Sequence, residues 1–133
     1  MSISHGTIAF DTLTTSDQVN TGTEKSLNTS YLYNGSAKAW CKNNNGGSFS
    51  DSFNCSGTTD NGTGDYTTAI NNDMSDANYS IQLNCLNSST QNTDCYAQAQ
   101  AAGTVRNIIR FGDSGSNSDA DKPVYVTAHG DLA

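Results

Sequence analysis

The chain has 133 residues, a length that predicts one domain with one modest core. Its net charge of −7, with only six Lys and Arg residues, argues against nucleic-acid binding, because contact with phosphates requires a basic surface. The chain contains 16 Asn, 17 Ser and 16 Thr, and 34% of its residues are hydrophobic. The buried face of one subunit would then be thin, so we expect a homo-oligomer.

Residues 1–29 are predicted to form a short strand and a linker-like segment, which is a candidate attachment region. Ile8 and Phe10 alternate with polar neighbours, and a Thr- and Gly-rich connection follows from Thr14 to Asn28. The N-terminus has no basic region and no apolar run of about seven residues, so we expect no signal peptide. No stretch is apolar enough to span a bilayer. We expect residues 30–133 to form a β-sandwich within a single-domain chain.

Residues Ser30–Lys42 suggest a longer strand that is interrupted at an Asn-Gly pair. Trp40 is the only tryptophan. We interpret it as a packing anchor, within the fold or at a subunit contact, rather than as a ligand-stacking residue. Asn43–Gly47 is a turn by composition, and a strand over 48–56 follows with Phe53 in its apolar phase.

The clearest pattern lies between Asp51 and Asn84. The run from Asp60 to Gly62 supplies the backbone freedom at positive φ that a tight hairpin needs. From Tyr79 onward, apolar and polar residues alternate strictly, which is typical of a half-buried strand. We expect core or oligomer anchors at six apolar positions, namely Trp40, Phe53, Tyr66, Tyr79, Ile81 and Leu83.

The C-terminal third contains three further predicted strands. In CYAQAQA the strict alternation, followed by Gly103, favours a strand over the helix that Ala and Gln would allow. Val105–Phe111 and the segment after Pro123 are also strands, on either side of a Gly/Ser/Asp loop over 112–121. About eight short strands without a convincing helix predict an all-β fold, an antiparallel and jelly-roll-like β-sandwich.

Four cysteines could form two disulfides. If residues 78–101 form a hairpin, Cys85 and Cys95 lie opposite each other and are the candidate disulfide. Cys41 and Cys55 are not expected to lie as directly opposite each other across the turn between them. Folding in a reducing cytoplasm favours free buried thiols at all four positions. No cysteine pair has the spacing of a zinc site, so we expect no metal and no cofactor.

The chain contains few of the residue patterns that catalytic sites require. The tetrapeptide Gly112–Gly115 looks like the nucleophile segment of chymotrypsin-type serine proteases, but the chain is far too short for the two-barrel fold that holds their histidine and carboxylate. Glu24 is the only glutamate, so paired glutamates of a glycosidase are missing. Oxygens of the 112–121 loop lack the spacing of an EF-hand, which favours a solvated loop over a Ca²⁺ site. We therefore expect no enzyme, and a glycan-degrading enzyme is the least favoured alternative.

Four blocks of the chain carry a family resemblance through their order and spacing. They are Tyr33–Trp40, Asp51–Asn54, Thr59–Thr67, and Met74 with Ala77–Tyr79. In these blocks the chain resembles a group of bacteriophage proteins that are common in cyanophages and other marine phages and are described as tail-fibre or virion structural proteins. The ending His129–Ala133 is similar to an ending in that group. Many members have another apolar residue at Cys41 and Cys55, so no family-wide disulfide is implied.

The resemblance implies a non-enzymatic component of the phage virion, made in the host bacterial cytoplasm. A trimeric β-sandwich on a fibre tip or other exposed appendage is expected, and the alternative is a capsid decoration or head-knob protein. Expected partners are copies of the chain, other virion proteins, and host surface glycan or protein, without nucleic acid or membrane insertion. Because loops at the ends of a sandwich commonly carry recognition, six loop residues are candidate contacts. They are Asn44, Asn45, Ser88, Gln91, Asp113 and Asn117.

Overall fold

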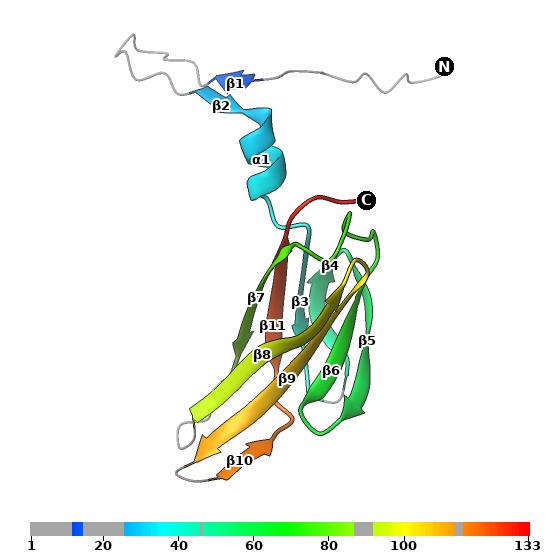
Figure 1. The fold of residues 1–133 in the computed structure, drawn as a ribbon, viewed down its shortest axis with the longest axis vertical. Helices are drawn as coiled ribbons and strands as arrows, with labels where there is room; N and C mark the ends of the chain where they lie inside the picture. The colour runs from blue at the N-terminus through cyan, green and yellow to red at the C-terminus, as the bar shows by residue number, and fades with distance from the viewer. Residues whose placement is uncertain (1–11, 15–25, 46, 87–91, 114–115) are drawn as a thin grey trace. The chain divides into compact units, whose positions relative to one another are not determined.

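The computed structural model describes most of the chain, namely residues 12–14, 26–45, 47–86, 92–113 and 116–133. The chain divides into two compact units, the first ending at Ser36 and the second beginning at Ala37 (Figure 1). Within the described ranges, no helix is long and apolar enough to cross a membrane.

The N-terminal unit contains a pair of very short strands and one helix. Strands β1 (Thr12–Thr14) and β2 (Ser26–Asn28) pair antiparallel, with Leu13 opposite Leu27. The strand predicted over residues 8–10 lies outside the described residues.

Helix α1 (Thr29–Gly35) occupies a segment for which the sequence pattern predicts a strand. The helix begins because Asn28 Oδ1 accepts a hydrogen bond from the backbone N–H of Ser30 at 2.9 Å, which gives a partner to one of the free donors of the first turn. None of its residues is buried. The prediction of a strand over residues 30–34 is therefore wrong, because a local side-chain cap competes with β structure here.

The second unit contains two antiparallel sheets. In the four-stranded sheet, β4 (Phe49–Phe53), β3 (Ala39–Asn43), β11 (Val124–His129) and β7 (Ser80–Cys85) lie side by side in that order. Buried and more exposed residues alternate along β3 and β11. One face of this sheet therefore packs on the core, and the other is open to solvent.

The five-stranded sheet has β9 (Thr104–Asp113) at its centre. Strand β8 (Asn92–Ala101) pairs along one edge of β9, while β6 (Asp65–Ile70) and β10 (Ser116–Asp119) pair with successive parts of the other edge. Strand β5 (Cys55–Gly62) adds to β6 and completes the sheet. The segment CYAQAQA is thus part of a strand, as its alternation predicts.

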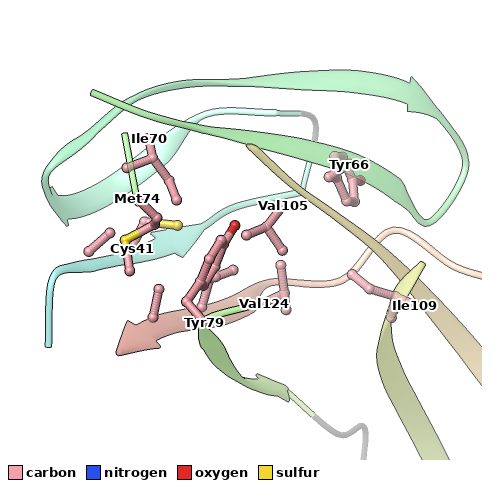
Figure 2. Close-up of a cluster of buried hydrophobic side chains, with 11 residues drawn as sticks. Cys41, Tyr66, Ile70, Met74, Tyr79, Val105, Ile109 and Val124 are labelled. Atoms are coloured by element: carbon pink, nitrogen blue, oxygen red, sulfur yellow. The ribbon is translucent and has the colours of Figure 1, made fainter. Parts of the chain in front are cut away.

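The two sheets face each other (Figure 1), and the residues of the hydrophobic core lie between them. Figure 2 shows Cys41 and Val124 pointing inward from the four-stranded sheet, and Tyr66, Val105 and Ile109 from the other. All five side chains are at most 2% exposed. The predicted antiparallel β-sandwich is confirmed, and the described residues of this unit form nine strands rather than about eight.

Four of the six expected anchors belong to this core. Tyr66 is completely buried, and Tyr79 is 7% exposed with its hydroxyl donating to the carbonyl oxygen of Ala101 at 2.9 Å. Burial raises the pKa of Tyr79 to about 12. Ile81 and Leu83 are partly buried and pack against the same cluster.

Trp40 and Phe53 lie on the opposite side of the four-stranded sheet. Their side chains are 38% and 55% exposed, so of the two expected roles, core or oligomer anchor, they do not fill that of a core residue of the single chain. Because side chains alternate along a strand, Trp40 faces outward when its neighbour Cys41 faces the core. A contact of these two rings with another subunit stays a prediction.

The expected hairpin over residues 60–64 joins β5 and β6. Gly64 adopts φ +69°, and a Cβ atom there would come within 2.5 Å of the carbonyl oxygen of Ile109. Glycine is therefore required at this turn by both its backbone conformation and its surroundings.

Asn54 forms the corner at which the chain passes from β4 in one sheet to β5 in the other. Its backbone adopts φ +54°, a conformation that asparagine tolerates better than most residues. Its side-chain amide donates to the carbonyl oxygen of Lys38 at 2.9 Å, and its Oδ1 accepts from the backbone N–H of Asn72 at 2.8 Å. The corner is therefore held by side-chain as well as backbone geometry.

Strands β7 and β8 do not form the predicted hairpin over 78–101. Strand β7 pairs with β11 and β8 pairs with β9, so these consecutive strands belong to opposite sheets. The cross-strand geometry predicted for Cys85 and Cys95 is therefore wrong, while a bond between them stays a prediction. All four cysteines are free thiols in this structure.

Candidate recognition surface on the four-stranded sheet

Two rows of side chains cross the outer face of the four-stranded sheet. Each row takes one residue from each strand, and the pairing register makes consecutive members neighbours. The first row consists of Phe53, Trp40, Thr127 and Gln82. The second row consists of Asp51, Lys42, Tyr125 and Asn84. We call these eight residues the aromatic face.

Three aromatic rings stand on this face. Phe53 is 55% exposed, Trp40 is 38% exposed and Tyr125 is 37% exposed. Phe53 and Trp40 are direct cross-strand neighbours, so their side chains adjoin. Grouped exposed rings of this kind mark binding surfaces, because covering them with a partner removes apolar area from water.

Polar side chains accompany the rings in both rows. Gln82 and Asn84 are exposed on β7, and Thr127 lies between Trp40 and Gln82. In the part of the chain that the structure describes, none of these three polar side chains forms a hydrogen bond. Their donors and acceptors are therefore available to the hydroxyl groups of a ligand.

The charges of the aromatic face cancel. Lys42 and Asp51 are cross-strand neighbours, and the Lys42 ammonium lies 5.7 Å from the centroid of the Tyr125 ring. That contact is a cation–π interaction, so the positive charge of Lys42 already has a partner within the face. Although the whole chain carries a net charge of −7, this face has no net formal charge. A charged ligand is therefore neither attracted nor repelled by a net charge of this face.

The outer face of the five-stranded sheet is built differently. Arg106 Nε donates to Asp65 Oδ1 at 2.9 Å, and a second guanidinium nitrogen donates to the other carboxylate oxygen. The Asn61 amide donates to the Thr67 hydroxyl at 2.9 Å. Ile108, the register neighbour of Asp65, is only 4% exposed. These polar groups bond to one another, and Ile108 beside them is buried.

A second ion pair lies on the same face of the five-stranded sheet. Arg110 Nε donates to Asp119 Oδ1 at 2.8 Å, and the guanidinium lies 5.5 Å from the centroid of the Tyr96 ring. The hydrogen bond to Asp119 raises the pKa of Arg110. In the other pair, the hydrogen bond from Arg106 holds the pKa of Asp65 below its usual value. Both shifts follow from partners within the chain, which stabilise the charged forms.

Two of the predicted loop residues follow β3 and lie outside the aromatic face. Asn44 Oδ1 accepts a hydrogen bond from the Ser50 hydroxyl at 2.6 Å, so its side chain helps to close the turn. Asn45 is exposed beside it. A contact of these residues with a host surface stays a prediction.

The other four predicted loop residues are described only in part. Ser88 and Gln91 lie outside the described residues. The backbones of Asp113 and Asn117 pair in the β9–β10 ladder, and their side chains lie outside the described part of the structure. This segment, predicted as a loop, is therefore partly a strand.

Sequence reasoning missed several members of the aromatic face. The alternation in VYVTAH indicates that Tyr125 and Thr127 share one side of a strand, and the alternation before Cys85 indicates the same for Gln82 and Asn84. No local signal shows that β11 lies between β3 and β7. The rows exist only because strands distant in the chain become neighbours.

The described residues hold no group of three or more His, Cys, Asp or Glu side chains that could bind a metal ion. Asp121, a candidate Ca²⁺ ligand by sequence, is engaged within the fold. Its Oδ1 accepts from the backbone N–H of Gly64 at 2.7 Å and from the Tyr66 hydroxyl at 2.9 Å. This carboxylate therefore fixes the β5–β6 hairpin to the segment before β11.

In comparisons with known proteins, no family model, no curated protein and no solved structure matches the chain. The structure defines the class, an all-β sandwich with an exposed aromatic face on one sheet. Since such a fold supports many functions, the functional inference depends on the chemistry of that face.

Proposed function

We propose that the chain is a non-enzymatic structural protein of a bacteriophage virion that contacts host-surface glycan through the aromatic face. The resemblance of residues 30–85 to phage virion proteins supports the setting. The observation that carries the proposed contact is the exposure of Phe53, Trp40 and Tyr125 beside polar side chains that have no bonding partner in the described structure.

Sugar rings fit the chemistry of this face. A pyranose has an apolar side of C–H groups, which packs against the flat side of an aromatic ring, and its hydroxyl groups both donate and accept hydrogen bonds. Gln82 and Asn84 offer amide donors and acceptors in the same rows as the rings. Because the residues stand on a paired sheet, their backbone positions are fixed before a ligand arrives, which lowers the entropic cost of binding.

The dimensions of the face favour an oligosaccharide over a single sugar. Each row spans three inter-strand steps of about 4.8 Å, which makes its length on the order of 15 Å. An open face of this kind buries only one side of its ligand, so a single site should bind weakly. Several copies on one particle would strengthen attachment through avidity, which agrees with the proposed trimer.

The proposed contact can be tested with the full chain on a panel of immobilised bacterial O-antigen and capsular polysaccharides. We expect at least one polysaccharide to bind, and Trp40→Ala to weaken that binding at least tenfold, about 1.4 kcal/mol, because it removes the largest ring of the face. Tyr96→Ala is the matched control, because its ring is 40% exposed on the outer face of the other sheet. This control should bind as the unchanged chain does.

Equal loss of binding in both variants, or no binding to any polysaccharide of the panel, would contradict the proposed contact. Light scattering on the same variants tests the alternative that Trp40 is a subunit contact. In that case Trp40→Ala would dissociate the oligomer and leave a species near the chain mass of 14.0 kDa. A concentration-independent monomer of the unchanged chain would refute the proposed trimer.

The position on the particle requires a separate experiment. In a reconstruction of the intact virion, density for this sandwich at a fibre tip or another appendage would agree with the proposal. Density confined to capsid hexamers or vertices would favour the alternative of a capsid decoration protein.

A further inference from the structure

The four cysteines are arranged as two pairs, and each pair has one member in each sheet. Cys41 lies on β3 and Cys85 ends β7, both in the four-stranded sheet. Cys55 begins β5 and Cys95 lies on β8, both in the five-stranded sheet. Cys41 is part of the core cluster between the sheets, and the other three pack against it.

The first pair is brought together by the corner at Asn54. Strands β3 and β5 are in contact across the interior, and the Cys55 thiol donates to the carbonyl oxygen of Trp40, with 3.5 Å between sulfur and oxygen. Trp40 directly precedes Cys41, so both thiols occupy the same small region. The hydrogen bond between the thiols is the main reason why the pKa of Cys41 is raised and the pKa of Cys55 is lowered.

The second pair, Cys85 and Cys95, packs against the same core from the edge strands β7 and β8. Cys85 is the register neighbour of Val124, and Cys95 is the register neighbour of Ile109. Val124 and Ile109 are completely buried, and Figure 2 shows both between the sheets. Burial raises the pKa of Cys95 to about 12, and a hydrogen bond with Cys85 adds to this shift.

The two pairs lie at opposite edges of the sandwich. Among the described strands, β7 and β8 are edge strands of their sheets. On the other side, β5 is an edge strand and β3 lies next to the edge strand β4. A covalent bond in each pair would add a side-chain link between the two layers at both open sides, where the chain also crosses from β4 to β5 and from β7 to β8.

We infer that Cys41 with Cys55, and Cys85 with Cys95, are the sites of two disulfides that connect the two sheets at both edges when the protein meets an oxidising environment. The inference rests on which strands the fold brings together and is independent of the proposed glycan contact. It also differs from the sequence-based prediction, because neither bond lies within a hairpin ladder and the pair of Cys41 and Cys55 is included.

The bonds would form by exchange with a small-molecule disulfide such as oxidised glutathione. The Cys55 thiolate attacks one sulfur of the reagent, whose S–S bond breaks and releases one thiolate. Cys41 then gives its proton to water, and its sulfur attacks Cys55 Sγ and releases the second thiolate. The protein loses two protons, one from each thiol, and two electrons, and the reagent becomes two thiols. Cys55 reacts first because Cys41 is 2% exposed and is not accessible to the reagent.

Peptide mapping of the full chain tests the connectivity. The folded protein is incubated with oxidised glutathione and then digested, without reduction, by a protease that cleaves before Asp. Cleavage at Asp51, Asp60 and Asp94 separates all four cysteines. We expect two linked peptide pairs, each about 2 Da lighter than the sum of its reduced peptides. Four thiols that can still be alkylated after oxidation, or links between other cysteines, would overturn the inference.

Thermal unfolding measures the effect of the bonds. Each disulfide closes a loop in the unfolded chain, so oxidation should raise the unfolding midpoint by on the order of 10 °C relative to the reduced protein. An unchanged or lowered midpoint of the correctly linked protein would show that the bonds do not connect the layers as inferred.

Two single variants test the order of reaction. In Cys41→Ser, Cys55 should remain as a mixed disulfide that adds about 300 Da. In Cys55→Ser, Cys41 should stay unmodified because it is buried. Formation of the bond between Cys85 and Cys95 in both variants is the internal control that they fold. Equal addition of glutathione to Cys41 and Cys55 would overturn the proposed order of reaction. If a variant does not fold, the peptide map of the unchanged chain still decides which cysteines are paired.

Discussion

The outer faces of the two sheets differ in how their side chains are partnered. On the five-stranded sheet, Arg106 with Asp65 and Arg110 with Asp119 form ion pairs within the chain. On the four-stranded sheet, the aromatic face exposes three rings, and its polar residues on β7 have no side-chain hydrogen bond in the described structure. The charged groups of the first face are paired within the chain, whereas on the aromatic face Lys42 contacts the Tyr125 ring and the amides of Gln82 and Asn84 have no partner in the described structure.

This difference shows why exposure alone is a poor guide to function. Tyr96 on the five-stranded sheet is 40% exposed, slightly more than Trp40, yet it already has a cation–π partner in Arg110. Trp40 instead adjoins a second exposed ring, Phe53. What distinguishes a binding face is the grouping of unpartnered side chains, because a ligand gains most where the protein has not already satisfied them.

The largest expected effect separates the two faces by stability. Ile108→Ala should lower the free energy of unfolding by about 2 kcal/mol or more, because the side chain is only 4% exposed although it lies on an outer face. Phe53→Ala, at 55% exposure, should cost less than about 1 kcal/mol. Urea denaturation of both variants measures the two values. Equal losses would mean that the faces do not differ in packing as described.

A smaller effect compares amide side chains on the two faces. The double variant Gln82→Ala with Asn84→Ala should weaken glycan binding roughly tenfold with little change in stability, since it removes two hydrogen-bonding groups that are free in the unbound chain. Asn61→Ala is the matched control, because its amide already bonds to Thr67. This control should lower stability and leave binding unchanged, as measured by calorimetry and thermal unfolding. If Asn61→Ala weakened glycan binding and the double variant did not, the binding site would lie on the five-stranded sheet instead of the aromatic face.

The smallest expected effect concerns pH and the ion pair of Asp65. Its pKa in the folded chain is lowered by the hydrogen bond from Arg106, so the ionised carboxylate adds stability above its usual value of 3.8, and this stability is lost as pH falls through the lowered pKa. The stability difference between the unchanged chain and Asp65→Asn should therefore be present at pH 7 and shrink at acidic pH. Glycan binding should not follow this change, because Asp65 lies on the other face. A difference that is constant between pH 7 and pH 2 would contradict the prediction.

Local sequence patterns predicted most strands correctly, because they depend on neighbouring residues. The hairpin at Gly64 and the strand character of CYAQAQA follow from turn chemistry and from alternation. Helix α1 does not follow from alternation, because it depends on the cap at Asn28, and Asn is favoured at N-caps and in turns alike. Asn107 is completely buried on β9, whereas its polar side chain would predict an exposed position.

The candidate site was predicted much less well than the strands. The sequence pattern marks Trp40 and Phe53 as core or oligomer anchors without showing that both lie on an exposed face of the subunit. The period of two shows which residues share a side of a strand without showing whether that side is buried. For a chain with few strongly apolar residues, the choice of buried side is decided by which partner sheet is present to cover it.

Alternation and turn residues act over a few positions, so they are enough to predict an all-β domain of short strands. Which strands become neighbours depends on the folded arrangement of the two sheets. That arrangement places β11 between β3 and β7, which assembles the aromatic face. It also sets β5 against β3 and β8 against β7 from the opposite sheet, which pairs the four cysteines. These arrangements depend on how the two layers pack around a shared core, and packing between distant segments leaves no local signal in the chain.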